Sequence, residues 1–232
     1  MKWNKLYNYP TSVRSLIKDE RHYAIGEEKL PSVTTILSAT QSDEKRASLA
    51  KWKQKVGENE AERVKNVAAE RGTKMHSILE GHIMGQGVLD LTDTGGEAHR
   101  MAKTIIDQGL PDLEEIWGSE VILAYPGLYA GATDLCGIYQ GRESIIDFKQ
   151  SNKPKKVEWI EDYKLQGAAY ATAHDDMFGT QMEQIVILMC TPDCFFQKFI
   201  INGKEFREYK WKWLERVNQY YEQKTKLNTT NA

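Results

Sequence analysis

The chain has 232 residues, of which 41% are hydrophobic and 28% are charged, a composition typical of one folded globular domain. Its formal net charge is −2, so a nucleic-acid partner would have to be bound by a local positive surface. Three cysteines argue against a disulfide scaffold and fit a reducing cytoplasm. The spacing of Cys190 and Cys194 has no matching second pair, which argues against a zinc or iron–sulfur site.

The ends and the interior of the chain show no signal for membrane attachment. The first residues have no apolar run long enough for a secretory signal, and no stretch is long and apolar enough for a transmembrane helix. We therefore expect a cytoplasmic protein without a membrane partner.

The first part of the chain, residues 1–110, is expected to contain a short hairpin followed by helices. Residues 23–26 indicate the hairpin, and Ser32 is a good N-cap for the first helix. The expected helices cover residues 33–37, 44–85 and 96–109, with breaks near Gly57 and Gly72.

The second part, residues 111–227, changes to the period of strands. Three consecutive strands are expected over residues 119–125, 128–139 and 143–150. A helix over residues 157–178, two strands over 184–191 and 195–201, and a final helix over 205–227 should follow. This order predicts an α/β or α+β fold with a sheet flanked by helices.

Three charged residues on the second and third of these strands are the strongest functional signal. Asp147 and Lys149 lie two apart, so both side chains point to one face of a strand that is otherwise apolar. A tight turn at Gln140-Gly141 would bring Asp134 toward Asp147. Buried charges need partners, and two carboxylates beside an ammonium suggest a divalent cation held by oxygen ligands. The simpler reading is an ordinary ion pair on a surface hairpin.

A second signal is the pair Gln166 and Tyr170, which share one face of the helix after the third strand. Small residues between them would let that helix lie close to the sheet, so Gln166 could orient a phosphate or a water beside the cation. A packing seam between helix and sheet explains the same pattern equally well.

His76 and Glu120 are weaker candidates. His76 shares a helix face with Glu80, but the zinc-protease motif His-Glu-x-x-His is absent. Glu120 could reach the cation or could be an exposed charge at a strand end.

Basic residues beside aromatic residues form three clusters that would suit a single nucleic-acid strand. They comprise Lys51, Trp52 and Lys53 with Lys55; Lys153 with Lys155 and Lys156; and Lys210, Trp211, Lys212 and Trp213 with Arg216. Amphipathic helices with buried tryptophans and solvated lysines give the same pattern, and at least one of Trp211 and Trp213 is expected in the core.

Together these residues resemble the PD-(D/E)xK nuclease superfamily in its RecB-like branch. The motif is Asp134 followed by Asp147-x-Lys149 and then Gln166-x-x-x-Tyr170. Most of the chain, roughly residues 20–225, is similar to the mitochondrial genome maintenance exonuclease family, including the stretches 30–37, 71–80 and 146–149. This sequence has Asp147 where many members of the superfamily have glutamate.

The resemblance implies one nuclease domain over residues 1–232 with a restriction-endonuclease-like core. It implies Mg²⁺ or Mn²⁺ held by Asp134, Asp147, the backbone carbonyl of Phe148, His76 and Glu120. Lys149 would polarise the attacking water and Gln166 would orient the phosphate. The implied DNA-binding residues are Lys51, Trp52, Lys53, Lys153, Lys155 and Tyr170.

The resemblance favours an exonuclease acting on free ends of single-stranded DNA in phage or bacterial replication, recombination or degradation, with proteins of those processes as possible partners. A structure-selective or nicking endonuclease, or a non-catalytic nucleic-acid-binding module, are the alternatives.

Overall fold

The computed structural model describes residues 1–17, 19–87 and 92–230. Its strands are β1 Lys2–Trp3, β2 Val13–Ile17, β3 Glu20–Ile25, β4 Glu28–Pro31, β5 Leu113–Tyr125, β6 Tyr129–Tyr139, β7 Arg142–Gln150, β8 Gln184–Cys190 and β9 Phe196–Asn202. Its α-helices are α1 Val33–Ala39, α2 Asp43–Val56, α3 Glu58–Ile83, α4 Asp93–Gln108, α5 Glu161–Phe178 and α6 Gly203–Thr230. Short 3₁₀ turns occupy Leu110–Asp112 and Val157–Trp159.

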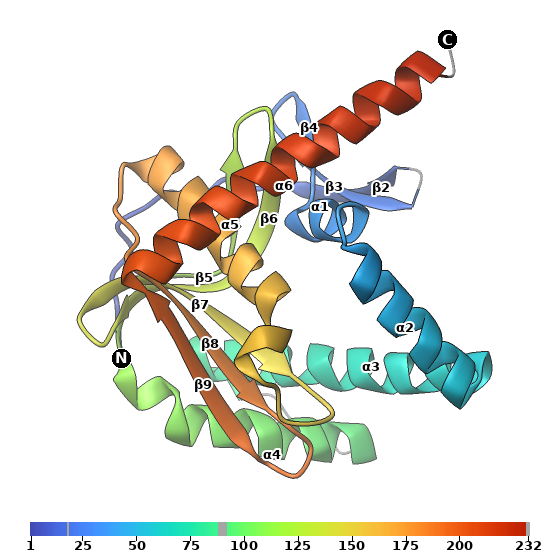
Figure 1. The fold of residues 1–232 in the computed structure, drawn as a ribbon. Coiled ribbons are helices and arrows are strands. Elements are labelled where there is room, and N and C mark those ends of the chain that lie inside the picture. The colour runs from blue at the N-terminus through green and yellow to red at the C-terminus, as the bar shows by residue number, and fades with distance from the viewer. Residues whose placement is uncertain (18, 88–91, 231–232) are drawn as a thin grey trace.

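The central sheet has the strand order β1-β5-β6-β7-β8-β9 and is mixed, because the β1–β5 and β7–β8 pairs are parallel and the others antiparallel. Figure 1 shows α5 and α6 on one face of this sheet and α3 and α4 on the other. Strand β8 lies between β7 and β9, and every one of its residues is buried, as expected for a strand covered on both faces. The predicted α/β class with a helix-flanked mixed sheet is confirmed.

The two faces of the sheet build two separate cores. Ile145 packs with residues of α5 and α6, whereas its neighbour Ile146 packs with residues of α3 and α4. This division follows from the alternation of side chains along a strand. Between them the two cores fix the positions of α3 and α5, the helices that approach the candidate site.

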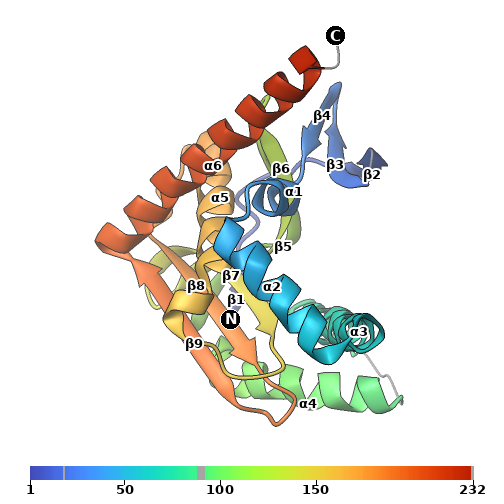
Figure 2. The ribbon, with the colours of Figure 1, turned by 45° about the vertical axis from the view of Figure 1, so that its right-hand side comes forward.

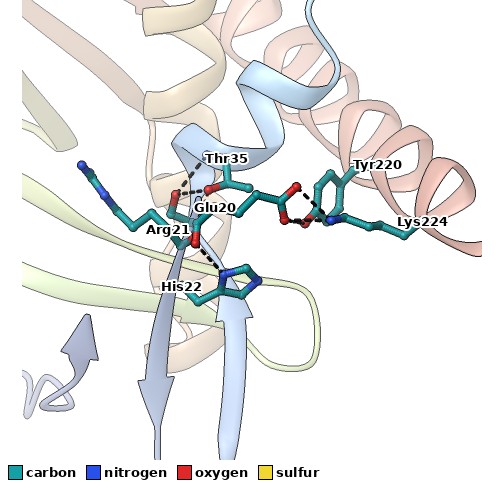
Figure 3. A network of polar contacts seen from close by, with 7 residues as sticks. Glu20, Arg21, His22, Thr35, Tyr220 and Lys224 are labelled. Atoms are coloured by element: carbon teal, nitrogen blue, oxygen red, sulfur yellow. Dashed lines mark hydrogen bonds and ion pairs between the residues drawn. The ribbon is translucent and has the colours of Figure 1, made fainter. Parts of the chain in front are cut away.

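A second, three-stranded sheet (β2-β3-β4) contains the expected hairpin, which turns at Gly26 with a φ of 58°. Helix α1 follows directly, and Ser32 caps it by accepting a hydrogen bond from the Thr35 backbone at 3.0 Å. Figure 3 shows how this region meets the C-terminal helix: the Glu20 carboxylate accepts hydrogen bonds from Lys224 Nζ at 2.8 and 2.9 Å and from Tyr220 Oη at 3.2 Å. The small sheet is therefore joined to α6 by a charged contact.

The long charged segment of residues 44–85 forms two helices that end and begin at Gly57, as predicted. The predicted break near Gly72 is wrong, because α3 continues through it. A Cβ at this glycine would lie 3.3 Å from Gln150 Cγ, so the residue permits close approach of α3 to the end of β7.

Of the two tryptophans of α6, one lies in the core, as predicted. Trp213 is fully buried and meets the Tyr129 ring edge-on at 4.9 Å, whereas Trp211 is 71% exposed. Among the described residues no helix has the length and apolar character needed to cross a bilayer.

Candidate active site

The candidate site lies where β6 and β7 separate. The two strands pair from Tyr139 and Arg142 as far as Leu135 and Ile146, and then diverge. Beyond this point β6 continues beside β5, and β7 continues beside β8. The Phe148 N–H therefore has no strand partner on the β6 side, and it donates instead to Asp134 Oδ2 at 2.7 Å. The backbone of β7 thus fixes the Asp134 carboxylate at the point where β6 and β7 separate, which we call the fork.

Three side chains from three elements meet beside this fork. His76 of α3, Glu120 of β5 and Asp134 of β6 offer ligand atoms that all lie within 4.8 Å of one another. His76 Nδ1 lies 3.5 Å from Asp134 Oδ1. Glu120 has a φ of 52°, an unfavourable conformation for a residue with a Cβ, and such outliers concentrate at functional sites.

Asp147 and Lys149 lie on the strand opposite Asp134 and form a close ion pair. Lys149 Nζ donates to Asp147 Oδ1 at 2.8 Å and lies 2.6 Å from Oδ2. The Asp147 side chain is 3% exposed, and its Oδ2 receives no well-oriented hydrogen bond from any residue that the structure describes. Beside the Lys149 ammonium, this carboxylate oxygen keeps a lone pair that could bind a second cation.

The carboxyl groups differ in pKa because their surroundings differ. Burial would raise the pKa of Asp134, but His76, Lys149 and the Phe148 N–H together hold it below its ordinary value. Burial raises the pKa of Asp147 to about 6 despite the attraction of Lys149, and the nearby Asp134 adds to the rise. Burial and the charge of Asp134 raise the pKa of Glu120 to about 7.

Burial acts on the pKa of the two basic groups in the opposite direction from that of the carboxyl groups. Burial alone would lower the pKa of both His76 and Lys149. Asp134 more than offsets this for His76, and Asp147 with Asp134 does so for Lys149, so both pKa values are raised. An excess of carboxylates thus remains in a confined space, which is the electrostatic condition that a divalent cation relieves.

The donor set fits a divalent cation such as Mg²⁺ or Mn²⁺. Carboxylate oxygens are the ligands that Mg²⁺ prefers, and Mn²⁺ accepts carboxylates and an imidazole together. His76, Glu120 and Asp134 supply this combination at one point. Asp147, which is ion-paired with Lys149, lies on the facing strand.

Helix α5 carries Gln166 and Tyr170 near the fork: burial raises the pKa of Tyr170, and the charges of Asp147 and Asp134 add to the rise. The Tyr170 ring lies over Gly131 of β6, where a Cβ would come within 2.9 Å of the ring. Gln166 Nε2 donates to Tyr170 Oη at 3.3 Å. Tyr170 is only 3% exposed, and the DNA contact that the family resemblance implies for it stays a prediction. Its small partner Gly131 explains why it is buried.

Three residues of the first two clusters, Trp52, Lys153 and Lys155, line one groove of about 540 Å³. Trp52 of α2 lines one side, and Lys153 and Lys155 of the β7–α5 connection line the other. Lys51 and Lys53 are exposed on α2 beside Trp52, which is itself 37% exposed. Tyr163 of α5 also lines the groove.

Two residues that contribute to the candidate site are not predicted from the sequence. The Tyr163 ring lies 5.2 Å from Lys149 Nζ, so one residue joins the groove to the candidate site. Arg71 of α3 is buried and donates to Gln150 Oε1 from both Nε and Nη2, at 3.2 and 3.1 Å, which anchors the end of β7. The position of Arg71 just before Gly72, where α3 meets β7, could have indicated this role.

The chain is similar to mitochondrial genome maintenance exonuclease 1 of Mus musculus, with 31% identity over 211 residues that span 86% of this chain and 61% of the mouse protein. The protein of the same name from Homo sapiens is 27% identical over 208 residues, spanning 86% of this chain and 60% of that protein. The chain therefore spans about three fifths of the length of these relatives. No family model matches it.

A solved structure confirms the fold. The crystal structure of a putative exonuclease from Eubacterium rectale superimposes with a TM-score of 0.53, covering 72% of this chain and 69% of that chain at 16% sequence identity. At this identity the similarity concerns the arrangement of the sheet and its helices.

Proposed function

We propose that this protein is a metal-dependent deoxyribonuclease that hydrolyses phosphodiester bonds from free ends of single-stranded DNA. The observation that carries the proposal is the convergence of His76, Glu120 and Asp134 at the fork, with Asp147 and Lys149 on the facing strand. The relatives named exonucleases support the same activity. The residue pattern further supports membership of the PD-(D/E)xK superfamily in its RecB-like branch.

His76, Glu120, Asp134 and Asp147, with the Phe148 carbonyl, would hold Mg²⁺ or Mn²⁺. When bound, such an ion supplies Lewis-acid polarisation of the phosphate and lowers the pKa of a water nucleophile. Lys149 is held at the site as a cation by Asp147 and Asp134, where it would stabilise negative charge that develops on the phosphate. Gln166, one turn before Tyr170, would orient the phosphate near the fork.

The groove between α2 and the β7–α5 connection would bring the strand to this site. Lysines for phosphates and a half-exposed Trp52 for bases are the combination that binds single strands without sequence preference. Duplex DNA would offer its phosphates but not its stacked base faces, so single strands are the preferred substrate. Replication, recombination or DNA degradation in a phage or a bacterium would provide such free ends.

The test is digestion of 5′- and 3′-labelled single strands with Mg²⁺, Mn²⁺ or EDTA. We expect metal-dependent release of short products, abolished in Asp134→Asn and in Lys149→Ala. Lys198→Ala, which changes a partly exposed lysine of β9 paired with Asp112, is a matched control and should retain full activity. Digestion by Lys149→Ala at the wild-type rate would refute the assignment.

A covalently closed circular single strand separates the proposal from a nicking endonuclease. An exonuclease leaves the circle intact, whereas an endonuclease linearises it. Tight binding that EDTA does not affect, with no turnover under either metal, would instead indicate a non-catalytic binding module.

A further inference from the structure

The N-terminal strap, residues 2–9, is fixed across the outer edge of β5 and the end of α3. Its first residues pair in parallel with β5, and Trp3 Nε1 donates to the Ile83 carbonyl at 3.2 Å. At its other end, Tyr9 Oη lies 3.1 Å from Cys136 Sγ and 3.1 Å from His174 Nε2. The aromatic residues of the strap are therefore held in defined positions before any ligand arrives.

Between the strap, β5 and the end of α3 lies a pocket of about 560 Å³, large enough for a small flat ligand. Its lining is dominated by aromatic rings, with Trp3, Tyr7 and Tyr9 from the strap and Trp117 from β5. The Tyr7 and Trp117 rings meet edge to face at 5.4 Å. Trp117 is only 5% exposed and stacks on His174, so the ring surface open to a ligand comes from the partly buried Trp3, Tyr7 and Tyr9.

One basic side chain also lines the pocket. Lys5 of the strap is exposed and lines the same pocket. A ligand with a flat ring and an attached negative charge matches this pairing, and a nucleotide has both parts.

The position of the pocket links it to the candidate active site. Ser119 lines the pocket, donates to the Asp134 carbonyl at 3.3 Å and directly precedes Glu120. Met84, which also lines it, lies four residues after Glu80 and eight after His76, so the three residues follow one face of the helix. His76 and Met84 are therefore separated by about 12 Å along the axis.

The basic groove lies on the other side of the site. Glu60 and Val64 of α3 line that groove, more than three turns before His76. Along α3 the order is thus groove, candidate metal ligands and aromatic pocket. A strand that enters through the groove would reach the pocket after it has passed the fork.

We propose that the aromatic pocket binds a nucleobase of the DNA strand on the far side of the scissile phosphate from the basic groove, with Lys5 contacting the adjoining phosphate. This inference rests on the proposed function, because it takes single-stranded DNA as the occupant. Holding one base beyond the fork sets which phosphate lies at the candidate metal ligands, and so sets the register of cleavage.

Photocrosslinking in EDTA tests the pocket without requiring hydrolysis. A short single strand carrying 5-iododeoxyuridine at one position near its end is irradiated with the full-length protein, and crosslinked peptides are identified by mass spectrometry. We expect crosslinks to Trp3, Tyr7 or Tyr9 at one nucleotide position. Crosslinks at Trp52 alone would refute the pocket and leave the groove intact.

Charge reversal provides a matched pair of variants. Lys5→Glu should lower the yield of pocket crosslinks about fivefold, because the new carboxylate repels the phosphate. Lys29→Glu makes the same change at an exposed lysine of β4 in the small sheet and should leave the yield unchanged. Equal yields in both variants would overturn the role of Lys5.

Cleavage of the same strand with Mg²⁺ or Mn²⁺ separates the two proposals. Pocket crosslinks without cleavage under either metal would refute the nuclease and support the base site. Metal-dependent cleavage with no pocket crosslinks would support the nuclease and refute the base site.

Discussion

His174 makes the stability of this protein depend on pH, and the dependence has a calculable size. The side chain is fully buried in α5 among aromatic rings, with Nδ1 2.8 Å from Thr180 Oγ1 and Nε2 3.1 Å from Tyr9 Oη. Thr180 Oγ1 donates its own hydrogen to Asp175 Oδ1, so it accepts from Nδ1–H, and the neutral ring satisfies both contacts. Burial lowers the pKa of His174 to about 4, and Asp175 opposes the shift only in part.

The folded protein therefore resists a proton that the unfolded chain accepts near pH 6.5. Above pH 6.5 both states hold a neutral ring, and the contribution of this residue to stability is fully present. As the pH falls from 6.5 toward 4 the unfolded chain becomes protonated first, and stability is lost. A change in pKa from 6.5 to about 4 corresponds to a loss of about 3 kcal/mol.

Urea denaturation of the wild type and of His174→Gln, measured from pH 8 to pH 4, isolates this term. Other carboxylates titrate in both proteins, so the quantity that matters is the difference between their free energies of unfolding. This difference should shift by about 3 kcal/mol in favour of the variant as the pH falls. Parallel pH profiles for the two proteins would show that His174 is protonated in the folded state without cost, contrary to its buried neutral network.

Three further predictions concern the site and the sheet. Mn²⁺ at a hundred times its Kd should raise the free energy of unfolding by about 2.7 kcal/mol and the Tm by several degrees; an equal rise in Asp134→Ala would place the ion elsewhere. Gly137→Ala should destabilise by about 3 kcal/mol or prevent folding, because its Cβ would lie 2.0 Å from a backbone carbonyl oxygen of β5. A Cβ at Gly87 would meet no atom of the described residues within 4 Å, so Gly87→Ala serves as its control in the same denaturation series; similar losses in both would contradict the steric argument. Tyr163→Leu should lower kcat about tenfold by removing the ring contact that helps to position the Lys149 ammonium, whereas Tyr163→Phe retains the ring face and should keep most activity; equal kcat values for the two variants would argue against the ring contact.

The sequence predicts the centre of the site because that centre depends on local geometry. The Gln140-Gly141 turn fixes the register of β6 against β7, and the register in turn sets Asp134 opposite Asp147. Helix boundaries at Gly57 and Ser32 also follow from residues within a few positions of the boundary.

The remaining features depend on parts of the chain that are distant in sequence. The burial of Tyr170 requires Gly131 on another element, and the continuity of α3 through Gly72 is stabilised by tertiary contacts with β7. Strand β5 begins at Leu113, earlier than its pattern indicates, and residues 2–3 pair beside it. The separation of β6 from β7 likewise arises from their different neighbours, β5 and β8.

The contact between Glu20 and Lys224 joins residues 204 positions apart, and Arg216 Nε donates to Thr40 Oγ1 across 176 positions. During synthesis on the ribosome, the small sheet and α1 emerge early but must wait for almost the whole chain before α6 packs beside them. Contacts of such separation form late and slow the folding of a domain. In the meantime the apolar residues of α1, Val33, Ile36 and Leu37, lack the α6 side chains that complete their core in the folded protein. Nascent chains that end before α6 should consequently be the species most prone to aggregation and most dependent on chaperones.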